Sequence, residues 1–325
     1  MLFNNYNHQL NKFLNIFFLL TFFLFNNKKN QIPSIIHPKV SIIIQIPNDL
    51  RIIYSCISSI IKSTPNIPYE IIISGSLLNT KISKIKKDFT NLVIINNHKE
   101  NNFIDYNQFF QSSKGDYVIF LSYNTKVYAN WLDFLINLIE NDKKIGMVGS
   151  KIIYSNGLLE EAGSIAWNNG EFSNFAELKD QNLPEFNYVK EVDYVSGSSL
   201  IIRKSAWKLL RGFDDRYESL FYKLIDFSFK LRKYGFKVMY QPKSVVKHYY
   251  KYDKNNNILL NIKNNKTLDK NLILKKWKNE LEHKDVGKNK FFQIDNGFIK
   301  RESSSLIYRF LILKTMQGHD ALLCI

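Results

Sequence analysis

Acidic residues are scarce in this chain. Its 325 residues include 29 Asp and Glu against 45 Lys and Arg, which gives a formal net charge of +16. Such a charge attracts anionic partners such as nucleotides, phospholipid surfaces and nucleic acid, because the summed field acts without a specific site. A compositional bias toward Lys, Asn, Ile and Phe throughout the chain explains the positive net charge better than an anionic partner does. Since the sequence has no recognised nucleic-acid motif and no interleaved basic and aromatic face, we expect no nucleic-acid partner.

Cysteine is also rare, with only Cys56 and Cys324 in the sequence. Cys56 lies within an apolar helical pattern, and Cys324 is near the end of the chain. This pair offers neither a disulfide framework nor the spacing of a metal site. The two cysteines are compatible with a reducing compartment, and we expect a cytoplasmic or membrane-associated protein.

The apolar segment near the N-terminus is too short to span a bilayer. It runs from Phe13 to Phe25, is interrupted by Asn15 and is followed by Lys28-Lys29. A spanning helix needs roughly 20 apolar residues, and no small-residue cleavage site follows the segment. The segment is therefore either an anchor at the membrane or a helix that packs on the folded domain.

Strand-like and helical patterns alternate from Lys39 onward. The predicted strands of the first half are Lys39 to Ile46, Tyr69 to Ile73, Leu92 to Ile95 and the central run from Gly115. The helices between them are Leu50 to Ser63, Asn79 to Phe89 and Phe103 to Ser113. Such alternation with short loops predicts a mostly parallel sheet with helices on both faces. Right-handed crossovers then place the strand exits along one edge.

The second half continues this pattern around a loop-rich insertion, Glu160 to Glu185. Its predicted helices are Trp131 to Asn141 and Tyr222 to Tyr234, the latter capped by Gly235, and its predicted strands are Ile145 to Tyr154, Lys237 to Tyr240 and Val245 to His248. Gly197 separates two strand-like halves of Tyr188 to Arg203. A glycine there suits close approach of another segment or a ligand, or marks a bend.

The strand exits are where chemistry is expected, because ligands of open α/β sheets bind beyond the carboxyl ends of the strands. The first strand ends at Pro47-Asn48, and the second at Ser74-Gly75-Ser76. The central strand, GDYVIFL, is followed by Ser122-Tyr123-Asn124. The central exit therefore contains no carboxylate.

In order and spacing, several motifs resemble the family 2 glycosyltransferases over about residues 39 to 250. They are VSIII, PYEIII, KGDYVIFL, the Trp131-Leu132 pair, MVGSKIIYSNGLLEEAG, EVDYVSGSSLIIR, GFD, DFSFKLRKYGFKVMYQP and His248. The resemblance implies a GT-A type, Rossmann-like fold with Mg or Mn as cofactor. It also implies sugar transfer from a nucleotide-diphosphate sugar to a glycan or lipid-linked acceptor.

The resemblance implies acids at three places, and this sequence lacks all three. Ser74 and Ser76 stand where an aspartate pair is expected, and Asn124 falls on the metal-binding aspartate. An amide oxygen can bind a cation but supplies no charge, whereas hard cations usually have carboxylate ligands. Lys223 and Leu224 replace an expected Glu-Asp pair, and leucine cannot act as a general base. The metal-binding residues of the family are therefore missing.

The remaining candidates follow from the matched positions. Asp226 is the candidate catalytic residue, and the candidate substrate-binding residues are Asn48, Ser74, Ser76, Asn124, Gly197 and His248. Lys223 or Arg203 could neutralise a diphosphate without a metal. The resemblance matches His248 to a histidine that can face the metal in the family; alternatively, His248 is a base or a strand-end residue without a ligand. Two functions follow: a transferase with impaired or lost activity, or an inactive homologue that binds a partner enzyme or a glycan.

The chain divides into four predicted segments: an N-terminal apolar segment and linker (1–34), a glycosyltransferase-like domain (35–255), a helical tail (256–289) and a C-terminal unit (290–325). In the tail, Leu274, Trp277 and Leu281 share one helical face. Phe291 to Asp295, Ser305 to Met316 and Ala321 to Ile325 predict a β-α-β unit. This unit resembles the start of a GT-B type domain, cut short here, and the alternative is an ordinary C-terminal extension.

Overall fold

The computed structural model describes residues 30–32, 35–45, 51–64, 66–75, 79–96, 106–249 and 267–284, and four short strands between 293 and 324. Asn48, Ser76 and the apolar segment from Phe13 to Phe25 lie outside the described residues. No helix in the described part is both long and apolar enough to cross a membrane.

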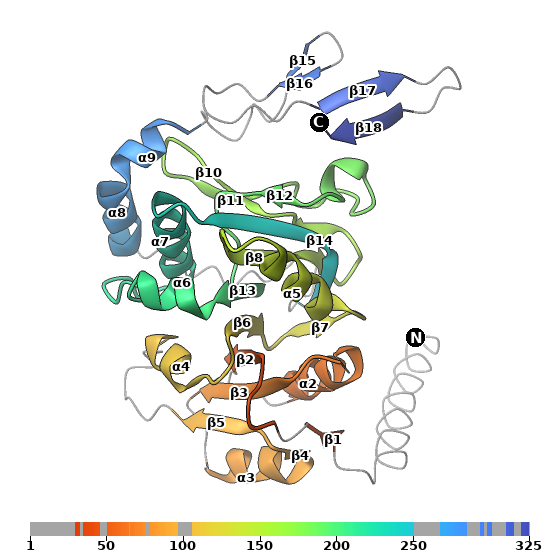
Figure 1. Ribbon diagram of the computed structural model, residues 1–325, viewed down its shortest axis with the longest axis vertical. Helices are drawn as coiled ribbons and strands as arrows, with labels where there is room; N and C mark the ends of the chain where they lie inside the picture. The colour runs from red at the N-terminus through yellow and green to blue at the C-terminus, as the bar shows by residue number, and fades with distance from the viewer. Residues whose placement is uncertain are drawn as a thin grey trace, which may run out of the picture.

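A ten-stranded mixed sheet runs through the domain (Figure 1). Its order is β12 (Lys190–Glu191), β14 (Lys237–His248), β8 (Ile145–Tyr154), β13 (Ser199–Arg203), β6 (Tyr117–Ser122), β2 (Val40–Gln45), β3 (Tyr69–Gly75) and β5 (Val93–Asn96). β7 (Thr125–Val127) pairs with β14, and β9 (Leu159–Glu161) with β8. The β5-β3-β2-β6 half and the β8-β14 pair are parallel. The predicted α/β class is confirmed.

Helices cover both faces of this sheet because its strands are apolar on both sides. Ile42 and Ile44 pack on the face that holds α2 (Arg51–Ser63) and α5 (Trp131–Asn141). Ile43 packs on the opposite face, which holds α4 (Tyr106–Ser112), α6 (Lys204–Leu209) and α7 (Leu220–Lys233). Successive side chains of a strand point to opposite faces. An unbroken isoleucine run therefore packs against the helices on both faces of the sheet.

Most predicted elements are present with boundaries shifted by a few residues. Helix α5 and strand β8 have the predicted bounds, and Gly235 ends α7 with a φ of 80°. The two predicted strands from Lys237 to His248 form one strand, β14, with a register shift between Gln241 and Val245. An irregularity accommodates Pro242 there, because proline cannot donate a ladder hydrogen bond.

The insertion and the tail pack against the upper half of the domain in Figure 1. The insertion contains the hairpin of β10 (Ser164–Ala166) and β11 (Phe172–Asn174) and a short 3₁₀ helix, Pro184–Phe186. The tail forms α8 (Thr267–Lys276) and α9 (Lys278–Glu282), as the amphipathic pattern predicts. Trp277 and Leu281 are buried against α7, and the Trp277 ring stacks on Phe229 at 5.4 Å.

The C-terminal unit differs from its prediction. It is an antiparallel sheet of β15 (Gln293–Asp295), β16 (Phe298–Lys300), β17 (Phe310–Lys314) and β18 (Asp320–Cys324). Strand β17 lies inside the predicted helix from Ser305 to Met316, so the β-α-β prediction was wrong for those five residues. A short apolar run fits a helix or a strand equally well, and here pairing with β18 decides between them.

Candidate functional site

The candidate site lies at the carboxyl ends of three neighbouring parallel strands. Gln45, the last residue of β2, pairs in register with Ser74 of β3 and with Ser122 of β6. Gly197 and Ser198 precede β13, and Ser198 accepts a hydrogen bond at its backbone oxygen from the Ser122 backbone N–H at 3.0 Å. The predicted convergence of strand exits on one edge is therefore present in the described chain.

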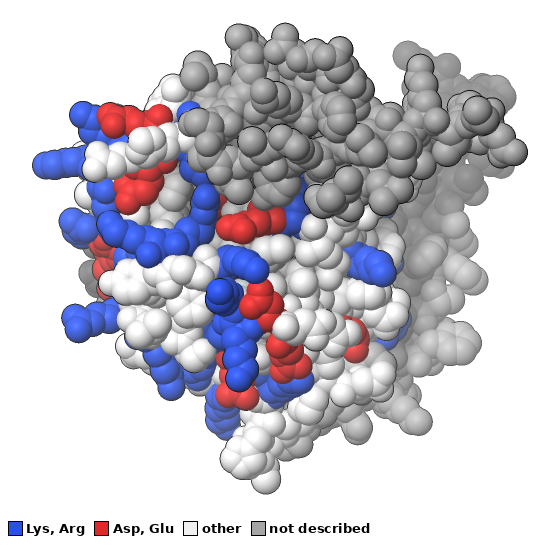
Figure 2. All heavy atoms as spheres, turned by 45° about the horizontal axis from the view of Figure 1, so that its top comes forward, with Lys and Arg blue, Asp and Glu red and all other residues white. Residues whose placement is uncertain are grey.

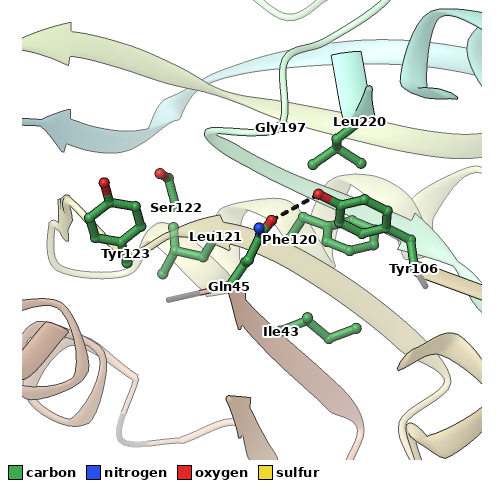
Figure 3. Close-up of a pocket in the computed structure, with 9 residues that line it drawn as sticks. All are labelled: Ile43, Gln45, Tyr106, Phe120, Leu121, Ser122, Tyr123, Gly197 and Leu220. Carbon is green, nitrogen blue, oxygen red and sulfur yellow. Dashed lines mark hydrogen bonds between the residues drawn. The ribbon is translucent and has the colours of Figure 1, made fainter. Parts of the chain in front are cut away.

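A pocket of about 230 Å³ opens at this edge (Figure 3). Its polar side chains are Gln45, Tyr106, Ser122 and Tyr123. The rest of its lining is Ile43, Phe120, Leu121, Leu220 and the backbone of Gly197. Among the predicted site residues, only Gly197 belongs to this lining.

Gln45 and Tyr106 form a hydrogen-bonded pair inside the pocket. The Tyr106 hydroxyl donates to Gln45 Oε1 at 2.8 Å (Figure 3). Burial raises the pKa of Tyr106 far above its usual value, so the phenol stays neutral and remains a donor. Sequence reasoning missed both residues, although a polar glutamine at the end of an isoleucine strand was an available signal.

Asn124 and His248 also come together, next to the pocket. The Asn124 amide nitrogen donates to the Tyr249 carbonyl oxygen at 2.7 Å, which orients the amide. Its Oδ1 accepts from the Ser122 hydroxyl at 2.6 Å and faces His248 Nε2 at 3.0 Å. Both carboxylate oxygens of Glu160 lie 3.1 Å from His248 Nδ1.

Both ring nitrogens of His248 therefore face oxygen acceptors. A neutral imidazole has one N–H and satisfies only one of them, whereas the imidazolium donates to both. Glu160 and His248 are both buried, so this contact is shielded from solvent. Sequence reasoning identified Asn124 and His248 but missed Glu160, which it placed at the start of the loop-rich insertion; the matched motif MVGSKIIYSNGLLEEAG contains this residue and was a usable signal.

Asp226 lies away from the pocket. Its side chain is fully buried, and its Oδ1 accepts from Trp277 Nε1 and pairs with Lys276 Nζ, both at 2.7 Å. Lys230 Nζ lies 3.5 Å from the other oxygen. These contacts connect α7 to the tail helix α8, so the structure places the candidate catalytic acid in a helix–helix contact.

The two predicted cationic substitutes also have structural partners. Lys223 is buried, with its Nζ 3.3 Å from the Asp214 carbonyl oxygen and 3.5 Å from Asp215 Oδ1. The Arg203 guanidinium donates to the Ile145 carbonyl oxygen and to backbone oxygens at the end of α5. A cation there complements the helix dipole. Neither side chain belongs to the pocket lining.

Gly197 permits a close approach to the start of α7. A Cβ at this position would lie 3.0 Å from Leu220 Cδ2 and 3.3 Å from Leu224 Cδ1. At these distances an added Cβ would make tight contacts, and the leucine side chains would have to move to relieve them. Apolar side chains therefore occupy the position where the family resemblance implies a catalytic acid.

Glu161 holds the backbone beside Gly197. Its Oε1 accepts from the Ser196 N–H at 3.0 Å and from the Ser164 hydroxyl at 3.2 Å. Its Oε2 is buried without a hydrogen-bond partner among the described residues, as is the Tyr194 hydroxyl. Burial raises the pKa of Glu161 to about 7 against the lowering effect of Ser196, and the Glu160 charge adds to the rise.

The described side chains do not fit the Mg or Mn that the family resemblance implies. No group of three or more His, Cys, Asp or Glu side chains in the described part of the chain is placed to hold a metal. Asn124, His248 and Glu160 come together beside the pocket, but their polar atoms face one another. Hard divalent cations require several oxygen ligands, usually with carboxylates among them.

Charge is mixed on the face shown in Figure 2. Lys and Arg side chains alternate there with Asp and Glu, beside a broad uncharged area. On this face, the described basic residues form no separate stripe.

Comparison with known proteins identifies the fold. No family model matches the chain, and no curated protein matches it. A crystal structure of GalNAc-T7 with UDP, GalNAc and Mn²⁺ matches with a TM-score of 0.55 at 17% sequence identity. The chain has a GT-A type glycosyltransferase fold. The match covers 67% of this chain and 45% of the GalNAc-T7 chain, so this chain spans less than half the length of that structure.

Proposed function

We propose that this GT-A protein has lost metal-dependent sugar transfer and binds a glycan at the strand-exit pocket. One observation carries the proposal. At the position that the family resemblance gives to the metal-binding aspartate, the Asn124 Oδ1 is shared by Ser122 and His248, and its Nδ2 donates to Tyr249. A neutral side chain whose polar atoms are all hydrogen-bonded is a poor ligand for a divalent cation.

The start of α7 supports the same conclusion. A general base must lie within hydrogen-bond reach of the proton that it removes. Leu220 and Leu224 approach Gly197 at this place, and Lys223 is held at Asp214 and Asp215. The nearby acid of α7, Asp226, contacts the tail instead.

The pocket itself supports a retained binding role. It combines a few oriented polar groups with an apolar lining, which is the composition of small-ligand sites. A hydrogen bond between Tyr106 and Gln45 fixes the orientation of both side chains in it. Such pre-organisation lowers the conformational cost of binding.

A second candidate is transfer without a metal, which the Glu160–His248 pair supports. A carboxylate that holds an imidazole is a common arrangement for proton transfer. In this alternative a nucleotide-diphosphate sugar is the donor and a glycan or lipid-linked molecule is the acceptor. The alternative requires the His248 ring to reach the substrate, although its Nε2 faces Asn124.

The test is a turnover and binding assay on the purified full chain, with UDP-sugars and GDP-sugars, with and without Mn²⁺. We expect no sugar transfer or donor hydrolysis and no increase in donor affinity on adding Mn²⁺. Metal-independent turnover that His248→Ala abolishes would favour the second candidate. Turnover that requires Mn²⁺ would contradict both.

A further inference from the structure

We propose that the pocket between Gln45 and Ser122 takes one uncharged sugar ring and excludes a nucleoside diphosphate. This inference rests on the proposed function, because it concerns the same pocket and names the chemical class of its ligand. Three properties of the pocket support it: the uncharged lining, the direction of the hydrogen bonds and the small volume.

The described lining carries no charge. Its polar groups are one amide and three hydroxyls, from Gln45, Tyr106, Ser122 and Tyr123. A diphosphate in such a pocket would lose its hydration without gaining a cation, and burying an unpaired charge is strongly unfavourable. Phosphate sites usually supply Arg, Lys or a metal. Sugar hydroxyls need only neutral partners.

Hydrogen bonds within the protein orient the polar groups in complementary directions. Because Tyr106 donates to Gln45 Oε1, the Gln45 Nε2 is the part of the amide that remains as a donor. The Ser122 hydroxyl donates to Asn124, so its remaining lone pairs act as an acceptor. Each sugar hydroxyl both donates and accepts, and adjacent hydroxyls of one ring can satisfy both groups.

The remaining walls suit the apolar faces of a ring. Phe120, Leu121 and Leu220 line the pocket around the Gln45 amide (Figure 3). A pyranose presents its C–H groups to such walls while its hydroxyls lie at the rim. Burying these C–H groups favours binding because it removes apolar surface from water.

The cavity is small. Its volume of about 230 Å³ lies below the roughly 300–1,000 Å³ of pockets for drug-sized ligands. One ring fits this volume, and a nucleotide-diphosphate sugar is larger than a drug-sized ligand. A terminal residue of a glycan, entering end-on, is the ligand that agrees with the uncharged lining, the hydrogen-bond directions and the small volume.

Saturation-transfer NMR on the full chain, with glucose, galactose and N-acetylglucosamine as probes, tests the inference. We expect transfer to at least one sugar, with a dissociation constant on the order of 1 mM. Ser122→Ala and Tyr123→Phe should each raise that constant between about twofold and tenfold, because each removes one hydrogen-bonding group. The exposed Ser112→Ala and Tyr128→Phe, both outside the pocket, are the matched controls and should leave it unchanged.

Three results would overturn the inference. They are no transfer to any neutral sugar, transfer that neither pocket variant weakens, and displacement of the sugar by metal-free UDP at lower concentration than by free sugar. Thermal denaturation of each variant shows whether a lost signal reflects unfolding. None of these results would be evidence of Mn²⁺-dependent turnover. The inference can therefore fail while the proposed loss of transfer stands.

Discussion

The side-chain oxygen of Asn124 lies 3.0 Å from Nε2 of His248, across 124 residues of sequence. Both residues stand at positions that the family resemblance assigns to the metal site. In this chain they bind each other, and Glu160 completes the set at the far side of the imidazole. The hydrogen bonds thereby stabilise a site without a cation, because each polar group already has a partner of opposite character.

Asn124→Asp should create affinity for Mn²⁺ that the unmodified chain lacks. The substitution places a carboxylate beside His248 and Glu160, and hard cations favour carboxylate oxygen. Isothermal titration with MnCl₂ measures the change. Asn141→Asp, at the exposed end of α5, adds the same charge away from the site and is the control. Equal Mn²⁺ binding by both variants would mean that the Asn124 position has no special role.

His248→Ala should destabilise the fold by about 3 kcal/mol. The change leaves the buried Glu160 carboxylate without the imidazole that both its oxygens face, and removing one partner of a buried pair is strongly destabilising. Urea denaturation at neutral pH measures the loss. Adding Glu160→Gln to the variant should recover part of it, because the neutral amide is less costly to bury. A loss under about 0.5 kcal/mol, typical of surface positions, would contradict the buried pair.

Glu161→Gln should stabilise the protein more at pH 8 than at pH 5. The folded-state pKa of Glu161, about 7, is above the ordinary glutamate value of about 4.5. The folded state therefore binds more protons than the unfolded state between these pH values, so the free energy of unfolding falls as pH rises through them. A glutamine keeps an acceptor for Ser196 and does not ionise. The gain at pH 8 should be on the order of 1–3 kcal/mol.

Chemical denaturation of Glu161→Gln at both pH values measures this gain. The exposed Glu282→Gln is the control for general effects of charge removal. If the two variants respond to pH in the same way, the burial of Glu161 has no part in the pH dependence.

Asp226→Asn should lower stability and leave ligand binding at the pocket unchanged. Asp226 is ion-paired with Lys276 and accepts from Trp277, so the substitution weakens the contact between α7 and α8 by about 1–3 kcal/mol. Thermal denaturation measures the first effect and sugar titration the second. Trp277→Phe removes the indole donor and part of the buried ring, so it should also lower stability, with a packing cost added to the lost hydrogen bond. A changed sugar affinity in a variant that is still fully folded would instead place Asp226 in the site.

The pattern of elements was largely predictable because it depends on local sequence. Runs such as Val40 to Gln45 are β-branched on both sides and are bounded by turn residues, so they predict buried strands without knowledge of their partners. The amphipathic spacing of α5 and α7 is equally local. Strand β17 could not be predicted this way, since four apolar residues suit either structure until a neighbouring strand pairs with them.

The sequence alone determined the pattern of strands and helices that predicts the GT-A architecture, placed no Asp or Glu in the central strand exit, Ser122-Tyr123-Asn124, and named Asn124 and His248 as site candidates. Only the tertiary structure paired those two residues, brought Tyr106 to Gln45, and turned Asp226 toward the tail helix. The physical reason is the range of each interaction. Periodicity and turn residues act within a few positions, whereas side-chain partners are chosen by strand register and helix packing between segments that are distant in the chain.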